Sequence, residues 1–67
     1  MAATSIWDRV LAGEVIECKA WDHEERKWLH TTLRCNDKGA VEAEDEEGLV
    51  WSPSQEELAD HNQFRFN

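Results

Sequence analysis

The first part of the chain has the spacing of an amphipathic helix. Its apolar positions are Ile6, Trp7, Val10 and Leu11. These positions recur at intervals that place them on one side of a helix. Thr4 or Ser5 can cap the helix, Asp8 forms an acidic variant of a capping box with Ser5, and Gly13 is a natural stop. We therefore predict a helix of about two turns that ends before Gly13.

From Val15 onward the hydrophobic period changes to two. One alternating run has Ile16, Cys18 and Ala20 on one face and Glu17, Lys19 and Trp21 on the other. A second has Leu29, Thr31, Leu33 and Cys35 against Trp28, His30, Thr32 and Arg34. Strict alternation is typical of strands with one face in the core, so both runs are predicted to be half-buried strands.

Two turns set the register of the strands that follow. Residues 36–39 and 45–48 repeat one pattern, an Asn or Asp three residues before a Gly. This pattern is typical of a type I turn closed by a glycine with positive φ and a bulge. The resulting register places Cys35 opposite Val41, Leu33 opposite Ala43, Ala43 opposite Trp51, Asp45 opposite Leu49 and, on the first hairpin, Trp21 opposite Trp28.

This register also predicts what faces the core. The residues expected to point inward are Leu33, Val41, Ala43, Leu49 and Trp51, with the carboxylates and both tryptophans of the first hairpin outside. Cys18 and Cys35 are separated along the sheet by roughly 13 Å, which is beyond the reach of a disulfide. We expect two buried thiols, as suits a reducing compartment.

The end of the chain predicts one more helical turn and a last strand. Ser54 and Glu57 form a second capping box after Pro53, so a helix should begin at Ser54 and end by Asn62. Residues 63–66 then alternate again, with Phe64 and Phe66 on one face, as in a short closing strand. The predicted fold is mainly β, a single domain over residues 1–67. It is an SH3-like barrel of about five antiparallel strands: a four-strand meander, a helical turn and a closing strand, preceded by a short helix.

Charge narrows the class of partner. The 67 residues include 15 Asp and Glu against 7 Lys and Arg, a formal net charge of −8. Such a domain repels phosphate backbones and anionic lipid, so we expect no direct nucleic-acid binding and no membrane association. No apolar stretch is long enough to cross a bilayer and the start of the chain lacks the features of a signal peptide. The expected compartment is the cytoplasm, the host's if the protein is viral.

The middle of the chain resembles a Tudor domain, a small SH3-like barrel. The resemblance covers about residues 13 to 60 and rests on Gly13, the segment 18–21 (Cys-Lys-Ala-Trp), Trp28 and the segment 41–48. It implies an aromatic cage that holds a methylated Arg or Lys. Trp21 and Trp28 match two cage positions, but Glu44 and Glu47 stand where the family has aromatic residues. Half a cage edged with carboxylates favours an ordinary Arg or Lys over a methylated one.

The candidate binding residues are Trp21, Trp28, Glu42, Glu44, Glu46 and Glu47. Two indoles facing each other on the outer face would form an exposed apolar patch that needs a partner. The alternative is that Trp7, or the strand with Phe64 and Phe66, covers them. The acidic residues between positions 42 and 47 are either a footprint for a basic partner or simply a solvated face. Arg34, predicted opposite Glu42, favours a cross-strand charge pair there.

The remaining polar residues do not point to catalysis. The histidines and cysteines show no metal-ligand spacing, and no glycine-rich elbow or phosphate loop is present, so we expect no metal, no cofactor and no enzymatic activity. We interpret the chain as a non-enzymatic module that binds an Arg- or Lys-rich protein segment through its acidic face and exposed Trp residues. The alternative function is a small phage-type inhibitor that imitates nucleic-acid charge. A third possibility is a subunit of a larger assembly.

Overall fold

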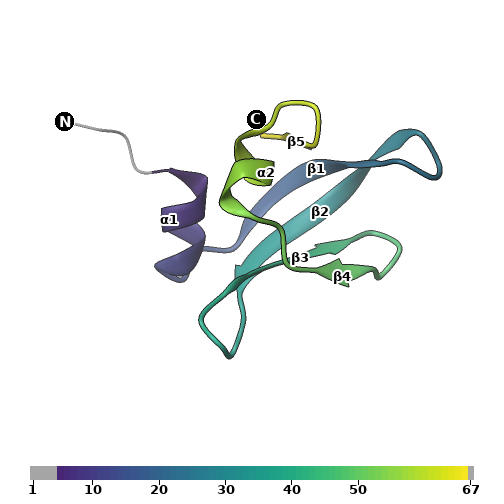
Figure 1. Ribbon diagram of the computed structural model, residues 1–67. Coiled ribbons are helices and arrows are strands. Elements are labelled where there is room, and N and C mark those ends of the chain that lie inside the picture. The colour runs from purple at the N-terminus through teal and green to yellow at the C-terminus, as the bar shows by residue number, and fades with distance from the viewer. Residues whose placement is uncertain (1–4, 67) are drawn as a thin grey trace.

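A computed structural model describes residues 5–66, which form five strands and two short helices. In chain order these are α1 (Ile6–Leu11), β1 (Ile16–Asp22), β2 (Lys27–Cys35), β3 (Val41–Asp45), β4 (Val50–Trp51), α2 (Gln55–Ala59) and β5 (Phe64–Arg65). The strands are antiparallel and belong to one sheet of order β4-β3-β2-β1-β5 (Figure 1). The predicted mainly β fold of five antiparallel strands with an N-terminal helix is confirmed.

The predicted register is also confirmed. Trp21 pairs with Trp28 across β1 and β2, and the β2–β3 and β3–β4 pairings are those that the two glycine turns required. Gly39 and Gly48 have φ values of +78° and +90°, a region where a side chain would be strained. Alternation and turn chemistry are local properties, which is why they fix the pairing so well.

Both helices begin at the residues that the sequence indicates. Ser5 caps α1 by accepting a hydrogen bond from the Asp8 backbone N–H, while Thr4 lies outside the described residues. Ser54 and Glu57 form a complete capping box on α2. This helix ends at Ala59, before Asn62 as predicted, because residues 60–63 turn back to pair β5 with β1.

The core lies between the inner face of the sheet and the two helices. Its buried apolar residues are Val10, Cys18, Ala20, Leu29, Leu33, Val41, Ala43, Leu58 and Phe64. Val10 comes from α1 and Leu58 from α2, so each helix contributes one fully or nearly buried side chain. Trp7 and Trp51 pack against this cluster while staying half-buried.

Two predictions about the β3–β4 turn are wrong. Leu49, expected inside, is 63% exposed, whereas Asp45, expected among the outer carboxylates, is only 8% exposed. The Asp45 carboxylate turns under the bend, where its Oδ1 accepts hydrogen bonds from the backbone N–H groups of Glu47 and Leu49 at 2.9 and 3.0 Å. Leu49 faces an open groove at the end of the sheet, so no side chain covers it.

The sheet is curled, and its two edges approach each other through aromatic rings. β4 and β5 stand at opposite edges of the sheet, yet the ring centroids of Trp51 and Phe64 are 6.3 Å apart. Phe64 in turn stacks on Phe66. No strand pairing joins β4 to β5 within residues 5–66, so closure into an SH3-like barrel stays a prediction.

Both cysteines are free, as predicted. Cys18 is buried, and burial raises the pKa of its thiol to about 11, which makes it a poor nucleophile at neutral pH. Cys35 is half-buried rather than buried. Neither helix among the described residues is long and apolar enough to cross a membrane.

Candidate binding site

The turn between β1 and β2 and the turn between β3 and β4 lie at the same end of the sheet (Figure 1). This follows from the meander, in which every second turn returns to the same end. The first turn comprises residues 23–26 and the second residues 46–48. Because the sheet curls, the two turns face each other across its inner side.

A groove of about 830 Å³ lies between these turns, and we call it the hairpin–turn groove. Its apolar lining consists of Ala20, Trp21, Leu29, Leu49, Trp51 and Phe64. Its acidic lining consists of Asp22, Glu24, Asp45, Glu47 and Glu57. The volume is in the range of pockets that hold small molecules or single side chains, and the mixture of apolar and acidic lining favours an amphipathic cation.

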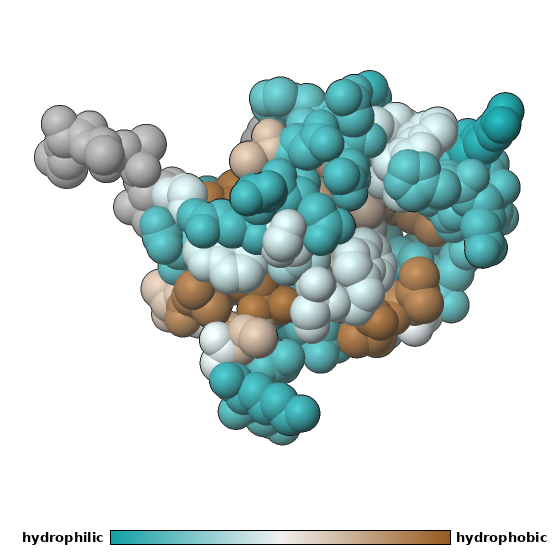
Figure 2. All heavy atoms as spheres, in the orientation of Figure 1, coloured by the Kyte–Doolittle hydropathy of each residue, from teal (hydrophilic) through white to brown (hydrophobic). Residues whose placement is uncertain are grey.

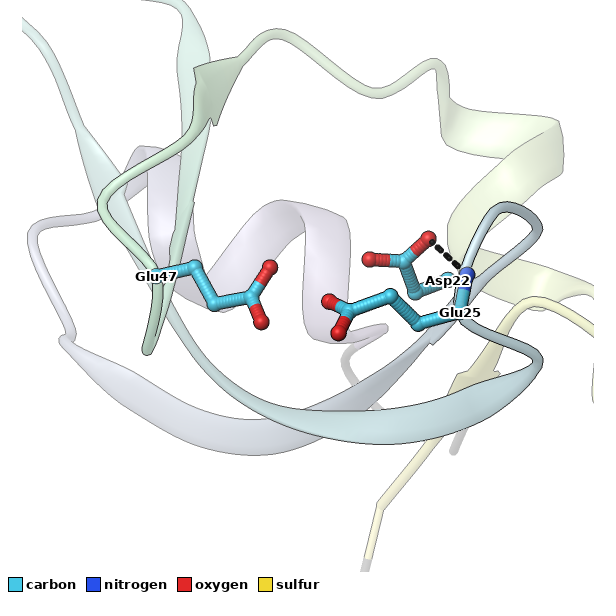
Figure 3. A group of neighbouring side chains, drawn as sticks. All are labelled: Asp22, Glu25 and Glu47. Atoms are coloured by element: carbon cyan, nitrogen blue, oxygen red, sulfur yellow. Dashed lines mark hydrogen bonds between the residues drawn. The ribbon is translucent and has the colours of Figure 1, made fainter.

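Three carboxyl groups meet at the rim of this groove. Asp22 ends β1, Glu25 lies in the β1–β2 turn and Glu47 lies in the β3–β4 turn. One oxygen of each lies within 4.8 Å of the others. Figure 3 shows the carboxyl groups of Glu25 and Glu47 pointing toward each other from opposite turns, with Asp22 beside them.

The local fold holds Asp22 in place and ionised. Its Oδ1 accepts hydrogen bonds from the backbone N–H groups of Glu24 at 2.8 Å and Glu25 at 3.2 Å. These bonds, that from Glu25 foremost, lower the pKa of Asp22 because they favour the charged form. These hydrogen bonds therefore favour the charged form of Asp22 beside the other two carboxyl groups.

The pKa of Glu47 is shifted in the opposite direction to that of Asp22. The carboxyl group of Glu25 raises the pKa of Glu47 to about 7, because a proton on the pair can be shared in a hydrogen bond. Partial desolvation and repulsion from the Glu25 charge act in the same direction. Near neutral pH the carboxyl pair of Glu25 and Glu47 is thus partly protonated.

The same three oxygens are ligands that hard metal ions prefer. Within residues 5–66 this is the one group of three or more side chains that could hold a metal ion, and it contains neither histidine nor cysteine. Exposed acidic groups commonly gather without a metal ion, so we assign no metal to this cluster.

The other acidic residues singled out in the sequence lie elsewhere. Arg34 bonds Glu42 at 2.6 Å and Glu44 at 2.8 Å on the outer face, so these two charges are partly compensated within the molecule. Glu46 accepts a hydrogen bond from the His30 backbone N–H at 2.7 Å. Only Glu47 of the predicted acidic residues belongs to the hairpin–turn groove.

The two tryptophans form an edge-to-face pair with ring centroids 5.4 Å apart. The guanidinium carbon of Arg65 lies 4.2 Å from the ring centroid of Trp28, a cation–π contact from β5. Both indoles are half-buried. The strand that contains Phe64 and Phe66 therefore does cover Trp28, but through the side chain of Arg65. Trp21 also lines the hairpin–turn groove.

An apolar surface continues from the groove onto the edge of the sheet. Leu49 is 63% exposed and Val50 46% exposed. Figure 2 shows an apolar area beside β4, bordered by polar side chains and separate from a second apolar area below α1. The groove therefore opens beside an apolar border that a partner could cover.

The sequence analysis did not single out Asp22 and Glu25, whose carboxyl groups lie close to that of Glu47. The β1–β2 turn contains no glycine, and Arg26 adopts a positive φ of 54° instead. The sequence therefore has no typical turn pattern at residues 23–26. The meander itself could have revealed the site, because it places residues 23–26 and 46–48 at one end of the sheet.

Comparison with known proteins identifies no relative: no family model, no curated protein and no solved structure matches the chain.

Proposed function

We propose that this protein is a non-enzymatic binding module that holds a basic side chain, Lys or Arg, of a protein partner in the hairpin–turn groove. The observation that carries the proposal is the meeting of Asp22, Glu25 and Glu47 at the rim of a groove with an apolar lining. Lys and Arg combine an apolar stem with a charged head, which is the complement of such a groove.

The parts of the groove have separate roles in this proposal. Leu49 and Trp51 supply the apolar surface on which the stem of the basic side chain lies. The rim carboxyl groups bind the charged head through charge-assisted hydrogen bonds. Trp21 extends the wall toward the outer face, where its pair with Trp28 offers further contact area to the rest of the partner.

The charge of the whole chain supports a basic partner. A formal net charge of −8 on 67 residues attracts cationic segments and accelerates their encounter. Arg34 compensates part of the charge at Glu42 and Glu44, whereas the ion pair at the groove rim, between Lys27 Nζ and Glu25, is longer at 3.5 Å. Among these acidic sites, the rim is the better position for an external cation.

The test uses a hexapeptide of alternating Lys and Arg as probe, titrated by calorimetry at about 50 mM salt, where charge interactions are weakly screened. The double variant Asp22→Asn/Glu47→Gln should bind the peptide at least about tenfold more weakly, since a lost charge-assisted contact is worth about that factor. Asn at position 22 keeps the acceptor oxygen that the turn needs.

The matched control is the double variant Asp37→Asn/Glu56→Gln, which makes the same two kinds of substitution at two exposed positions outside the groove. Its affinity should change less than about twofold, as expected for distant surface charges. Equal losses in both double variants would refute the groove as the site. They would favour the nucleic-acid mimic, whose binding depends on total charge and is insensitive to Trp21→Ala and Trp28→Ala.

A further inference from the structure

We propose that the basic segment of the partner binds as an extended strand along the free edge of β4, so that its alternate side chains enter the hairpin–turn groove. This inference rests on the proposed function and names the conformation of the partner at the same site. It comes from the position of β4 in the sheet, the direction of its backbone groups and its exposed apolar side chains.

The outer side of β4 is a free sheet edge. β4 stands last in the strand order, and its neighbour in the sheet is β3 (Figure 1). Many soluble proteins protect an edge strand from further pairing with a charged residue or a proline. The two residues of β4, Val50 and Trp51, belong to neither type. This edge is therefore open to an added strand.

The pairing of β4 with β3 shows where the backbone groups of Val50 point. The Asp45 N–H donates to the Leu49 carbonyl at 3.0 Å, so these two residues form a hydrogen-bonded pair. Bonded and non-bonded pairs alternate along an antiparallel ladder, so the next pair, Glu44 with Val50, is a non-bonded one. The N–H and C=O of Val50 therefore point away from β3, toward the free edge.

The other side of β3 leads to the same direction. The Asn36 N–H donates to the Ala40 carbonyl at 2.9 Å, which begins the β2–β3 ladder with a hydrogen-bonded pair. Alternation from that pair makes Thr32 and Glu44 a hydrogen-bonded pair as well. The backbone groups of Glu44 therefore point to β2, so they do not engage those of Val50.

The side chains along this edge suit a segment with alternating chemistry. Leu49 and Trp51 line the hairpin–turn groove, whereas Val50 lies between them on the outer face. Leu49 is 63% exposed and Val50 46% exposed, so an added strand would cover apolar surface on both faces. The partner residue opposite Val50 would lie on the outer face and its two neighbours on the groove side. An apolar residue between two basic ones fits this arrangement.

Charge distinguishes a foreign strand from β4 of a second copy. Two copies paired through this edge would bring together two formal net charges of −8, which repel each other. A cationic segment is attracted by the same charge, and Asp45, Glu47 and Glu57 line the groove beside the edge. A basic strand of another protein is therefore the expected occupant.

The experiment compares three forms of a capped pentapeptide, Lys-Val-Lys-Val-Lys, by calorimetry: unmodified, N-methylated at both valines, and N-methylated at the last two lysines. N-methylation removes a backbone donor. In the proposed register a valine N–H bonds Val50, whereas the lysine N–H groups point to solvent. We expect the valine-methylated peptide to bind at least about tenfold more weakly than the unmodified one, and the lysine-methylated peptide within about threefold of it.

Amide hydrogen exchange gives a second measurement on the protein itself. In the free protein the Val50 N–H should exchange faster than the Trp51 N–H, because the latter points to β3. The unmodified peptide should slow exchange at Val50 at least about tenfold, and the valine-methylated peptide at the same concentration should not.

Each outcome decides for or against the added strand. Equal affinities of the two methylated peptides, no binding of the pentapeptide, or unchanged exchange at Val50 with the pentapeptide bound would overturn it. A dimer of the protein alone in sedimentation equilibrium, with slow exchange at Val50, would also overturn it, because a second copy would then fill the edge. In all these cases binding of the basic hexapeptide would leave the proposed function standing. No binding of either peptide would refute the proposed function itself.

Discussion

A single side-chain oxygen organises each of the three turns between the first four strands. Asp22, Asn36 and Asp45 each use Oδ1 to accept hydrogen bonds from two backbone N–H groups of the turn that follows. Asn and Asp suit this position because their short side chains reach the backbone two residues on. The same bonds fix the direction in which Glu25 and Glu47 leave the backbone, so turn chemistry positions the rim.

Asp45 tests this use of a carboxylate as a turn acceptor. Asp45→Ala should lower the free energy of unfolding by about 2 kcal/mol, because two backbone N–H groups of the turn lose a charged acceptor that is itself nearly buried. Asp45→Asn keeps an acceptor oxygen and should lose less than half as much. Urea unfolding of both variants measures the difference. Equal losses would mean that the charge of Asp45, and not its hydrogen bonds, supports the turn.

The sequence predicts the backbone conformation of the two glycine turns well but the burial of their side chains poorly. The pattern of an Asn or Asp three residues before a Gly predicts positive φ at Gly39 and Gly48, because that requirement is local. It does not predict that Asp45 is buried and Leu49 exposed. Alternation assigns a face to each residue, but whether that face is covered depends on where α1 and α2 pack, which the pattern does not contain.

At the scale of elements, the β1–β2 hairpin and the β3–β4 turn face each other through carboxyl groups. Like charges this close repel, and the carboxyl group of Glu25 raises the pKa of Glu47 to about 7. The groove between the two turns is therefore sensitive to pH even without a ligand.

The pH dependence of stability tests this contact between the two turns. The pKa of Glu47 in the folded protein, about 7, lies above its ordinary value of 4.5, so the folded state binds more protons than the unfolded chain between these values. The contribution of Glu47 to the free energy of unfolding must therefore fall as pH rises from about 4.5 to about 7 and stay constant above that. Glu47→Gln should remove this slope, while the remote variant Asp37→Asn should retain it, as measured by urea unfolding at a series of pH values.

A slope that is unchanged in Glu47→Gln would contradict the shared proton. Glu25→Gln provides a second check, because it keeps a hydrogen-bond partner for Glu47 but removes the repelling charge. It should shift the steepest part of the Glu47 contribution to lower pH.

The order of elements was predictable because each begins and ends on a local signal, such as the capping box at Ser54 and the alternation from Ile16. The curl of the sheet was not predictable in the same way. It brings Trp51 of one edge within 6.3 Å of Phe64 of the other, ring centre to ring centre, and it creates the groove. Curl is the sum of small twists over all the strands, which no single segment encodes.

At the scale of the whole molecule, net charge and ion pairing act against each other. The described residues hold ion pairs such as those of Arg9 with Glu14 and of Arg34 with Glu42 and Glu44. Such pairs lie at the surface, where each is worth at most about 1 kcal/mol. The eight uncompensated negative charges occupy a molecule whose radius of gyration is 11.6 Å. The Debye length is about 10 Å at 0.1 M salt and about 30 Å at 0.01 M, so at low salt these charges repel one another across the entire fold.

We expect the repulsion among the excess negative charges to outweigh the attraction within the surface ion pairs. Adding NaCl from about 10 mM to about 500 mM should therefore raise the midpoint of thermal unfolding. The double variant Asp37→Lys/Glu56→Lys halves the net charge at two exposed positions outside the groove, and its midpoint should rise less with salt than that of the wild type. Thermal unfolding followed by circular dichroism measures both. A midpoint that falls with salt would show that the surface ion pairs, with Arg34 between its two glutamates, outweigh the excess charge. The attraction of basic partners would then have to come from the groove rim alone, because the field of the whole molecule would be too weak to matter.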